Sequence, residues 1–251
     1  MKVKNITAIL VCLFWVESVF FVGCGEEKTK PKPKEKQEVQ KVQVQPDYNQ
    51  IQRVEIPLDD PQGVASLARN FYFIFDGSGS MGDTYAGQVK LKGAKEAVRK
   101  FLTKVPQDAN LGLYVFDDRG TREVVPLGSN ERDAFMQAVD AVEHGGTTPL
   151  AEAIRFGTDR LVQQYKSQLG YGEYRLIVVT DGMASGIPNA AQRAARYGVP
   201  IYAIGLGIGG DHPLRAYAVS YREANNYEDL ERALEETLAE LPSFDPTEFE
   251  E

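Results

Sequence analysis

Oxygen-bearing side chains gather at three places in the sequence, each beside an apolar run. FDGSGSMG follows FYFIF, TDG follows RLIVV, and GGTTPL precedes a long amphipathic pattern. Carboxylate and hydroxyl oxygens are the hard ligands that Mg²⁺ and Ca²⁺ prefer in proteins. The residue types therefore indicate a divalent-cation site, provided that the fold brings the three places together. The candidate donors are Asp76, Ser78, Ser80, Thr147, Thr148 and Asp181.

The charge of these donors sets what such a site could bind. Two carboxylates beside one divalent ion leave it close to neutral, so the ion keeps affinity for a further anionic ligand from outside. The serine hydroxyls add dipoles without adding charge. Gly77 and Gly79 let the backbone turn sharply, so that Ser78 and Ser80 can face the same point.

From about residue 68, short apolar runs alternate with longer amphipathic patterns. The runs predict strands, several of them apolar on both faces, as in a sheet covered by helices on both sides. The patterns predict helices. Such alternation indicates an α/β fold, a doubly wound, mostly parallel sheet flanked by helices in a single domain. The predicted strands are 71–75, 111–116, 175–180 and 200–207, and the predicted helices are 90–105, 132–142, 149–165, 190–198 and 227–241.

One further segment, EVVPLG at residues 123–128, predicts a short antiparallel strand after a turn at Arg119-Gly120. Pro126 favours an edge position, because proline cannot donate a hydrogen bond to a neighbouring strand. Asp117, just before this turn, is interpreted as a turn residue and not as a ligand.

Ligands of a doubly wound sheet bind beyond the carboxyl ends of its strands, where the strand order reverses. The succession D-x-S-x-S, G-x-T-P-L and V-V-T-D-G, placed at such ends, resembles the metal-ion-dependent adhesion site (MIDAS) of the von Willebrand factor type A (VWA) domain. The resemblance covers roughly residues 68–241, essentially the whole part of the chain that we expect to fold.

The resemblance implies a role for each matched residue. Ser78 and Ser80 would bind the ion directly, Asp76 and Asp181 mainly through water and hydrogen bonds, and Thr148 directly or through water. The implied ion is Mg²⁺, with Ca²⁺ or Mn²⁺ as alternatives. In the family a partner protein supplies a carboxylate at the sixth position, so the implied partner presents Asp or Glu.

Four residues near these motifs are candidates for lesser roles or for none. Thr147 is the alternative to Thr148 as a ligand. Tyr85 and His144 are candidates for the rim of the site, although His144 also fits a solvent-facing loop position. His212, the other of the two histidines, is interpreted as a loop residue without a role.

The glycines of the first motif also fit G-x-G-x-x-G, the pattern of a dinucleotide-binding turn. Asp76 would then stand beside the pyrophosphate, and polar MGDTYAGQ occupies the place where a helix should begin. We therefore expect no nucleotide. A haloacid-dehalogenase-type phosphatase needs a carboxylate where Ser78 stands, and neither serine fits G-x-S-x-G. We expect no enzyme and no catalytic residue. Two alternatives stay open: a metal-assisted hydrolase using the same site, and a scaffold whose metal site is unused.

The first residues are typical of an exported bacterial lipoprotein. Two lysines precede a mostly apolar run, residues 6–22, which indicates a secretory signal. The sequence FVGC resembles a lipobox with phenylalanine where leucine is usual, and implies a signal peptide of residues 1–23 and lipidation of Cys24. Gly25 then implies delivery to the outer membrane of a two-membrane bacterium. The alternative is an uncleaved amino-terminal membrane helix. Both place the chain in the cell envelope.

The remaining boundaries follow from composition. Residues 24–66 are expected to form a disordered tether, because the Lys, Glu, Gln and Pro that dominate its first half leave little apolar surface to bury. The folded domain is expected at 67–242 and an acidic tail at 243–251. The net charge of −8 disfavours nucleic acid and anionic lipid surfaces. Membrane association would therefore come from the anchor.

Overall fold

A six-stranded sheet runs through the part of the chain that the computed structural model describes, residues 51–208 and 212–239. The expected signal peptide 1–23, Cys24 and the tail 243–251 lie outside the described residues. The strand order is β5-β4-β1-β6-β7-β8, in which β5 is antiparallel to β4 and the other neighbours are parallel. The strands are β1 (Arg69–Asp76), β4 (Asn110–Asp117), β5 (Gly120–Gly128), β6 (Glu173–Thr180), β7 (Ile201–Leu206) and β8 (Ser220–Ala224).

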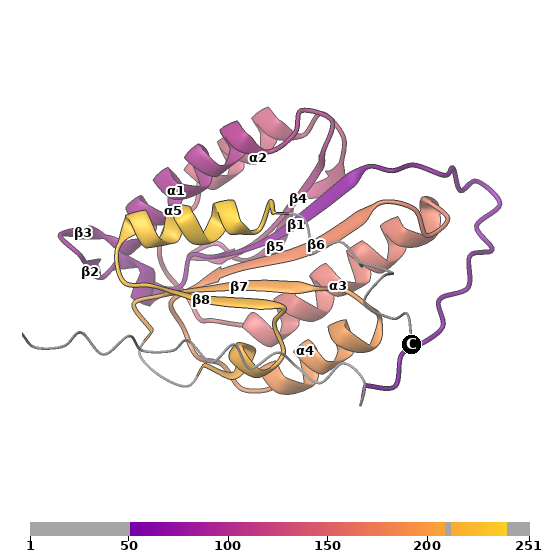
Figure 1. The fold of residues 1–251 in the computed structure, drawn as a ribbon. Coiled ribbons are helices and arrows are strands. Elements are labelled where there is room, and N and C mark those ends of the chain that lie inside the picture. Colours follow the sequence, from indigo (N-terminus) through magenta and orange to yellow (C-terminus); the bar gives the residue numbers. More distant parts are fainter. Residues whose placement is uncertain (1–50, 209–211, 240–251) are drawn as a thin grey trace, which may run out of the picture. The chain divides into compact units, whose positions relative to one another are not determined.

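Helices cover both faces of this sheet (Figure 1). The upper layer in the figure contains α1 (Lys90–Lys104), α2 (Arg132–Asp140) and α5 (Tyr227–Glu236), and the lower layer contains α3 (Leu150–Ser167) and α4 (Ile187–Arg196). Successive side chains of β1 point to opposite layers. Phe71, Phe73 and Phe75 are buried with the first layer, whereas Tyr72 and Ile74 are buried with the second. The predicted doubly wound α/β fold is therefore confirmed.

The predicted strand at 123–128 is confirmed as β5, an antiparallel edge strand. The turn before it also forms as predicted: the Asp117 carboxylate accepts a hydrogen bond from the Arg119 backbone N–H at 2.8 Å, and Arg122 Nη1 lies 2.7 Å from the same oxygen. Burial opposes ionisation of Asp117, but these hydrogen bonds hold its pKa below the usual value. Asp117 is thus a structural residue of the turn.

The helix expected at 227–241 forms as α5 but ends earlier than expected, at Glu236. The Thr237 hydroxyl donates to the Leu234 carbonyl at 2.6 Å, and the Thr237 carbonyl accepts a hydrogen bond from the buried Arg175 guanidinium. Arg175 thereby fixes the end of α5 to the sheet and satisfies one of the carbonyls that a helix end leaves free.

Neither β8 nor a small hairpin was predicted from the sequence. The hairpin consists of β2 (Thr84–Tyr85) and β3 (Gln88–Val89) and lies between β1 and α1. Ala86 and Gly87 form its two-residue turn with φ of 48° and 87°, the left-handed conformation that such turns require. An Ala-Gly pair is not among the usual residue signals for this turn, so the hairpin could not be predicted from its turn residues.

Residues 51–66, the described part of the expected tether, form no helix or strand, but hydrogen bonds attach them to the domain. The Val54 N–H donates to the Arg196 carbonyl at 2.8 Å, and the Val64 N–H donates to the Ser167 carbonyl at 2.9 Å. These carbonyls belong to the last residues of α4 and α3. Among the described residues, no helix is long and apolar enough to cross a membrane.

Candidate metal centre

The order of the strands reverses beside β1, and the two predicted carboxylates meet there. β1 has β4 on one side and β6 on the other. Chain order leads from β1 to β4 and β5 on one side, and from β6 to β7 and β8 on the other. The ligand crevice of such a sheet therefore lies beyond the carboxyl ends of β1 and β6. Asp76 ends β1, and Asp181 directly follows β6.

The Asp76 carboxylate is fully buried and held by two hydrogen bonds. One oxygen accepts from the Ser78 backbone N–H at 2.8 Å, and the other accepts from Thr180 Oγ1 at 2.5 Å. Burial raises the pKa of Asp76, and the hydrogen bonds from Ser78 and Thr180 act against this shift. The ionised form is thus under-compensated, and a nearby cation would stabilise it.

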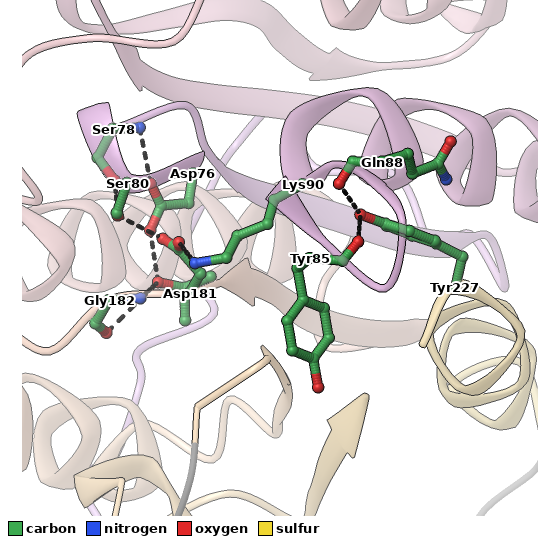
Figure 2. Close-up of polar contacts among 10 residues, drawn as sticks. Asp76, Ser78, Ser80, Tyr85, Gln88, Lys90, Asp181, Gly182 and Tyr227 are labelled. Carbon is green, nitrogen blue, oxygen red and sulfur yellow. Dashed lines mark hydrogen bonds and ion pairs between the residues drawn. The ribbon is translucent and has the colours of Figure 1, made fainter. Parts of the chain in front are cut away.

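Ser78, Ser80 and Asp181 form a connected network next to Asp76 (Figure 2). Ser80 Oγ donates to Asp181 Oδ1 at 2.8 Å, and the two serine oxygens are 3.2 Å apart. Because Ser80 gives its only proton to Asp181, Ser78 is the donor between the serines. Each hydroxyl oxygen keeps a lone pair that a cation could use. The network extends from the buried Ser78 to the exposed Ser80.

Thr148 lies at the same place. A Cβ built on Gly182 would be 3.2 Å from Thr148 Oγ1 and 3.6 Å from an Asp76 oxygen. The absence of a side chain at Gly182 therefore leaves space for the Thr148 hydroxyl beside the carboxylate. Thr147 is exposed. The structure thus brings Thr148 together with Asp76, Ser78, Ser80 and Asp181.

Lys90, which the sequence analysis missed, contacts this cluster directly. Its ammonium lies 2.7 Å from Asp181 Oδ2, and the side chains of Lys90 and Asp181 are 14% and 0% exposed. Lys90 is the first residue of α1, and no acidic residue occupies the first turn of that helix. A cation at a helix amino terminus opposes the helix dipole. This unfavourable placement is the sequence signal that could have singled out Lys90.

His212 also differs from the expectation of a loop residue without a role. It is buried, its Nδ1 accepts a hydrogen bond from the Leu214 N–H at 3.2 Å, and its Nε2 lies 3.1 Å from the Gly182 carbonyl oxygen. Since Nδ1 is the acceptor, Nε2 carries the proton and donates to Gly182. Burial lowers the pKa of His212. Neutral His212 therefore supports the loop that carries Asp181.

The two rim candidates lie close to the cluster without joining its hydrogen bonds. The exposed His144 ring covers Gly82, where an added Cβ would lie 2.5 Å from His144 Nδ1. The Tyr85 ring packs against Gly207 and points away from the carboxylates in Figure 2. His144 thus packs on the loop of the D-x-S-x-S motif, while Tyr85 supports the hairpin.

The donor set fits a hard divalent cation. Two carboxylates and three hydroxyls converge, and all are oxygen donors of the kind that Mg²⁺ and Ca²⁺ accept. The described residues contain no group of three or more His, Cys, Asp and Glu side chains that could hold a metal ion. A cation at this cluster would therefore depend on hydroxyl ligands and on a ligand from outside.

Comparisons with known proteins identify the family and agree with the fold. The family profile of the von Willebrand factor type A domain matches residues 70–240. An uncharacterized Bacillus subtilis protein, YwmD, is 27% identical over 190 residues, which are 66% of this chain and 83% of that protein.

Solved structures with the same fold include three of interest. BatB from Bacteroides thetaiotaomicron has a TM-score of 0.55 and 19% identity, over 70% of this chain and 97% of that one. The pilus adhesin SpaC from Lactobacillus rhamnosus GG has a TM-score of 0.56 and 16% identity, over 70% of this chain and 30% of that one. A mussel byssus matrix protein with a zinc-occupied MIDAS motif has a TM-score of 0.52 and 16% identity, over 70% of this chain and 48% of that one. This chain spans less than half of the adhesin and of the byssus protein, and at such identities the likeness concerns the fold.

Proposed function

The chain belongs to the von Willebrand factor type A domain family, and on this premise we propose that it binds a protein partner through a divalent cation held at the cluster of Asp76, Ser78, Ser80, Thr148 and Asp181. The observation that carries the proposal is the network at the strand ends, where Ser80 links the hydroxyl of Ser78 to the carboxylate of Asp181 beside the buried Asp76. A zinc-occupied site of this type in a structural relative supports a divalent ion.

In this proposal Ser78 and Ser80 bind the ion directly, and Asp76 and Asp181 act through water and through the hydrogen bonds described above. Thr148 completes the set. Mg²⁺ is the proposed ion, because the donors are all hard oxygens and Mg²⁺ is reluctant to give up its water. The partner contributes an Asp or Glu carboxylate, and the presence of a pilus adhesin among the structural relatives is consistent with protein recognition.

We further propose that the protein is anchored in the bacterial cell envelope through a lipidated Cys24, that Gly25 directs it to the outer membrane where there is one, and that it is not an enzyme. His212, which contacts the Gly182 carbonyl, uses both ring nitrogens in hydrogen bonds, so it offers no base for hydrolysis. A hydrolase would also need a nucleophile beyond the serines that the proposal assigns to the ion.

The proposal is tested by cation-dependent stability. Mg²⁺ or Mn²⁺ should raise the midpoint of thermal unfolding of the protein by several degrees at concentrations about a hundredfold above Kd, since a ligand that binds only the folded state stabilises it by about 2.7 kcal/mol. Ser78→Ala should abolish this rise. The matched control is Ser129→Ala, which replaces an exposed serine that follows β5.

Capture of a partner gives the second readout. Protein bound to beads and incubated with solubilised envelope should retain a partner that a chelator releases, and Ser78→Ala should retain none. If neither cation changes the unfolding midpoint of the wild-type protein, the proposal is overturned. The alternative of a scaffold whose metal site is unused would then stand. Phosphatase or esterase turnover that disappears in Asp76→Ala would favour a hydrolase instead.

A further inference from the structure

Lys90 supplies a positive charge at the edge of the candidate metal centre. Its Nζ is 2.7 Å from Asp181 Oδ2, while Ser80 donates to the other oxygen of the same carboxylate. Each oxygen of the Asp181 carboxylate therefore already has one donor from the chain itself. Figure 2 shows the Lys90 side chain reaching from α1 across to Asp181, beside the serines.

The position of Lys90 is not explained by the stability of α1. The helix begins without a side-chain cap at Val89 and without an acidic residue in its first turn, so a lysine there faces the positive end of the helix dipole. The Lys90 N–H donates to the Asp83 carbonyl at 2.9 Å, which fixes the backbone beside the loop of the D-x-S-x-S motif. Its ion pair with Asp181 is what offsets the unfavourable placement.

The charges of the cluster then add up differently from those of its two carboxylates alone. Asp76, Asp181 and Lys90 together carry one negative charge when both carboxylates are ionised. A divalent cation changes this sum to one positive charge, and the carboxylate of a partner returns it to zero. Without Lys90, the same cation would already make the cluster neutral. Lys90 should therefore oppose cation binding and favour the anion that follows.

We propose that Lys90 is a built-in counter-ion of the candidate metal centre: it competes with the divalent cation for Asp181 and, with that cation in place, helps to bind the carboxylate of the partner. This inference rests on the proposed function. The lysine stem has four rotatable bonds, so Nζ can leave Asp181 while the backbone stays fixed. Lys90 is thus a specificity-determining residue, one that weakens cation binding until a carboxylate arrives.

Two opposite changes in one variant test this inference. In Lys90→Met the Kd for Mn²⁺ alone, measured by electron paramagnetic resonance of the free ion, should fall by about tenfold or more because a repelling unit charge is removed. In wild type, potassium acetate should tighten Mn²⁺ binding relative to potassium chloride at equal ionic strength. In Lys90→Met that gain should be largely lost.

Two controls accompany the variant. Lys90→Arg keeps the charge and should stay near wild type in both measurements. Lys92→Met removes an exposed lysine from the same helix and should change neither. If Lys90 only held the Asp181 loop in shape, Lys90→Met would weaken Mn²⁺ binding instead.

The outcomes separate the inference from the proposed function. Wild type that binds Mn²⁺, together with a Lys90→Met variant that binds it equally or more weakly, overturns the inference and leaves the proposed function standing. Mn²⁺ binding by Lys90→Met but not by wild type supports the inference and overturns the proposed function for the unmodified chain. Binding by neither protein overturns both.

Discussion

Asp76 and Asp181 offer the same chemical group in opposite surroundings. Neutral donors hold Asp76, namely a backbone N–H and the Thr180 hydroxyl, whereas the ammonium of Lys90 contacts Asp181. The buried Asp76 therefore lacks charge compensation, while Asp181 already has it. A cation at the cluster would supply the positive charge that Asp76 lacks, but it would have to compete with Lys90 for Asp181. Asp76 therefore favours cation binding, and the Lys90–Asp181 ion pair limits it.

Single residues at this scale were predictable only in part. Asp76, Ser78, Ser80 and Asp181 could be expected to meet, because they follow strands whose carboxyl ends share one edge of a parallel sheet. The contact of Lys90 depends on the direction from which α1 approaches that edge. No spacing in the sequence encodes this direction, and the β2–β3 hairpin that precedes α1 was itself not predicted.

His212 gives a prediction about pH. Its folded-state pKa lies below the ordinary value of about 6.5, so below that pH the unfolded chain takes up a proton that the folded chain resists. The free energy of unfolding should therefore decrease as pH falls through this window, by at most about 1.4 kcal/mol per pH unit from this one group. Urea unfolding at steps between about pH 8 and pH 5 measures it.

The variant His212→Asn isolates this contribution. Asparagine keeps an acceptor for the Leu214 N–H but does not titrate, so the pH dependence due to the imidazole should vanish. The exposed His144 is present in both proteins, and its effect cancels in the difference. Parallel curves of unfolding free energy against pH for wild type and variant would contradict the assignment of a destabilising buried imidazole.

Between the residues and the whole molecule, the β2–β3 hairpin joins the candidate metal centre to α5. The Tyr227 hydroxyl, at the start of α5, lies 3.0 Å from the Tyr85 carbonyl oxygen and 3.1 Å from the Gln88 carbonyl oxygen. Gln88 is two residues before Lys90 in the chain. A displacement of this hairpin would therefore alter two contacts: the ion pair of Lys90 with Asp181, and the hydrogen bonds of Tyr227 in the first turn of α5.

The packing of α1 against α5 depends on Gly93. A Cβ built there would lie 1.7 Å from the Tyr227 ring, so Gly93→Ala must displace the ring and its hydrogen bonds to the hairpin. We expect a loss of about 1–3 kcal/mol in the free energy of unfolding, as overpacking costs, despite the gain of about 1 kcal/mol from replacing glycine in a helix. Chemical denaturation measures the difference.

The double variant with Tyr227→Ala is the matched control for this prediction. With the ring absent, Gly93→Ala should be neutral or stabilising, so the two changes should show a coupling energy of opposite sign to the single effect of Gly93→Ala. An equal loss in both backgrounds would mean that the cost arises elsewhere than at the ring.

Elements were predictable where burial dictates composition. β1, β4, β6 and β7 are fully or mostly buried, and their apolar runs follow from cover on both faces. β8 reads SYREA and is half-buried at the opposite edge from β5, so its composition does not differ from that of a loop. The two-residue strands of the hairpin are too short for any periodicity to show.

At the scale of the molecule, the chain enters the domain at the end remote from the candidate metal centre. Val54 and Val64 contact the last residues of α4 and α3, and these helices start at the edge of the sheet where the strands end. Arg69 opens β1 at the entry side, and Asp76 closes it at the cluster. The described amino-terminal segment and the cluster therefore lie at opposite ends of β1.

The anchor itself is tested at Cys24. Cys24→Ser should release the protein from sedimenting membranes into the soluble envelope fraction, because the thioether to lipid cannot form. Cys12→Ser is the matched control, since that cysteine lies within the apolar run 6–22 and should leave the distribution unchanged. A Cys24→Ser variant that still sediments with membranes would favour the uncleaved amino-terminal helix.

The opposed ends of β1 have a mechanical consequence. A pull between an anchored amino terminus and a partner held at Asp76 would load β1 along its own axis, with hydrogen-bonded neighbours β4 and β6 on both sides. Force in that direction shears the two ladders, so their bonds must yield together and not one after another as in unzipping. Resistance to such a pull is governed by the unfolding rate and not by the equilibrium free energy. Between the described amino-terminal end of β1 and the cluster, the domain thus presents a shear geometry and not an unzipping geometry.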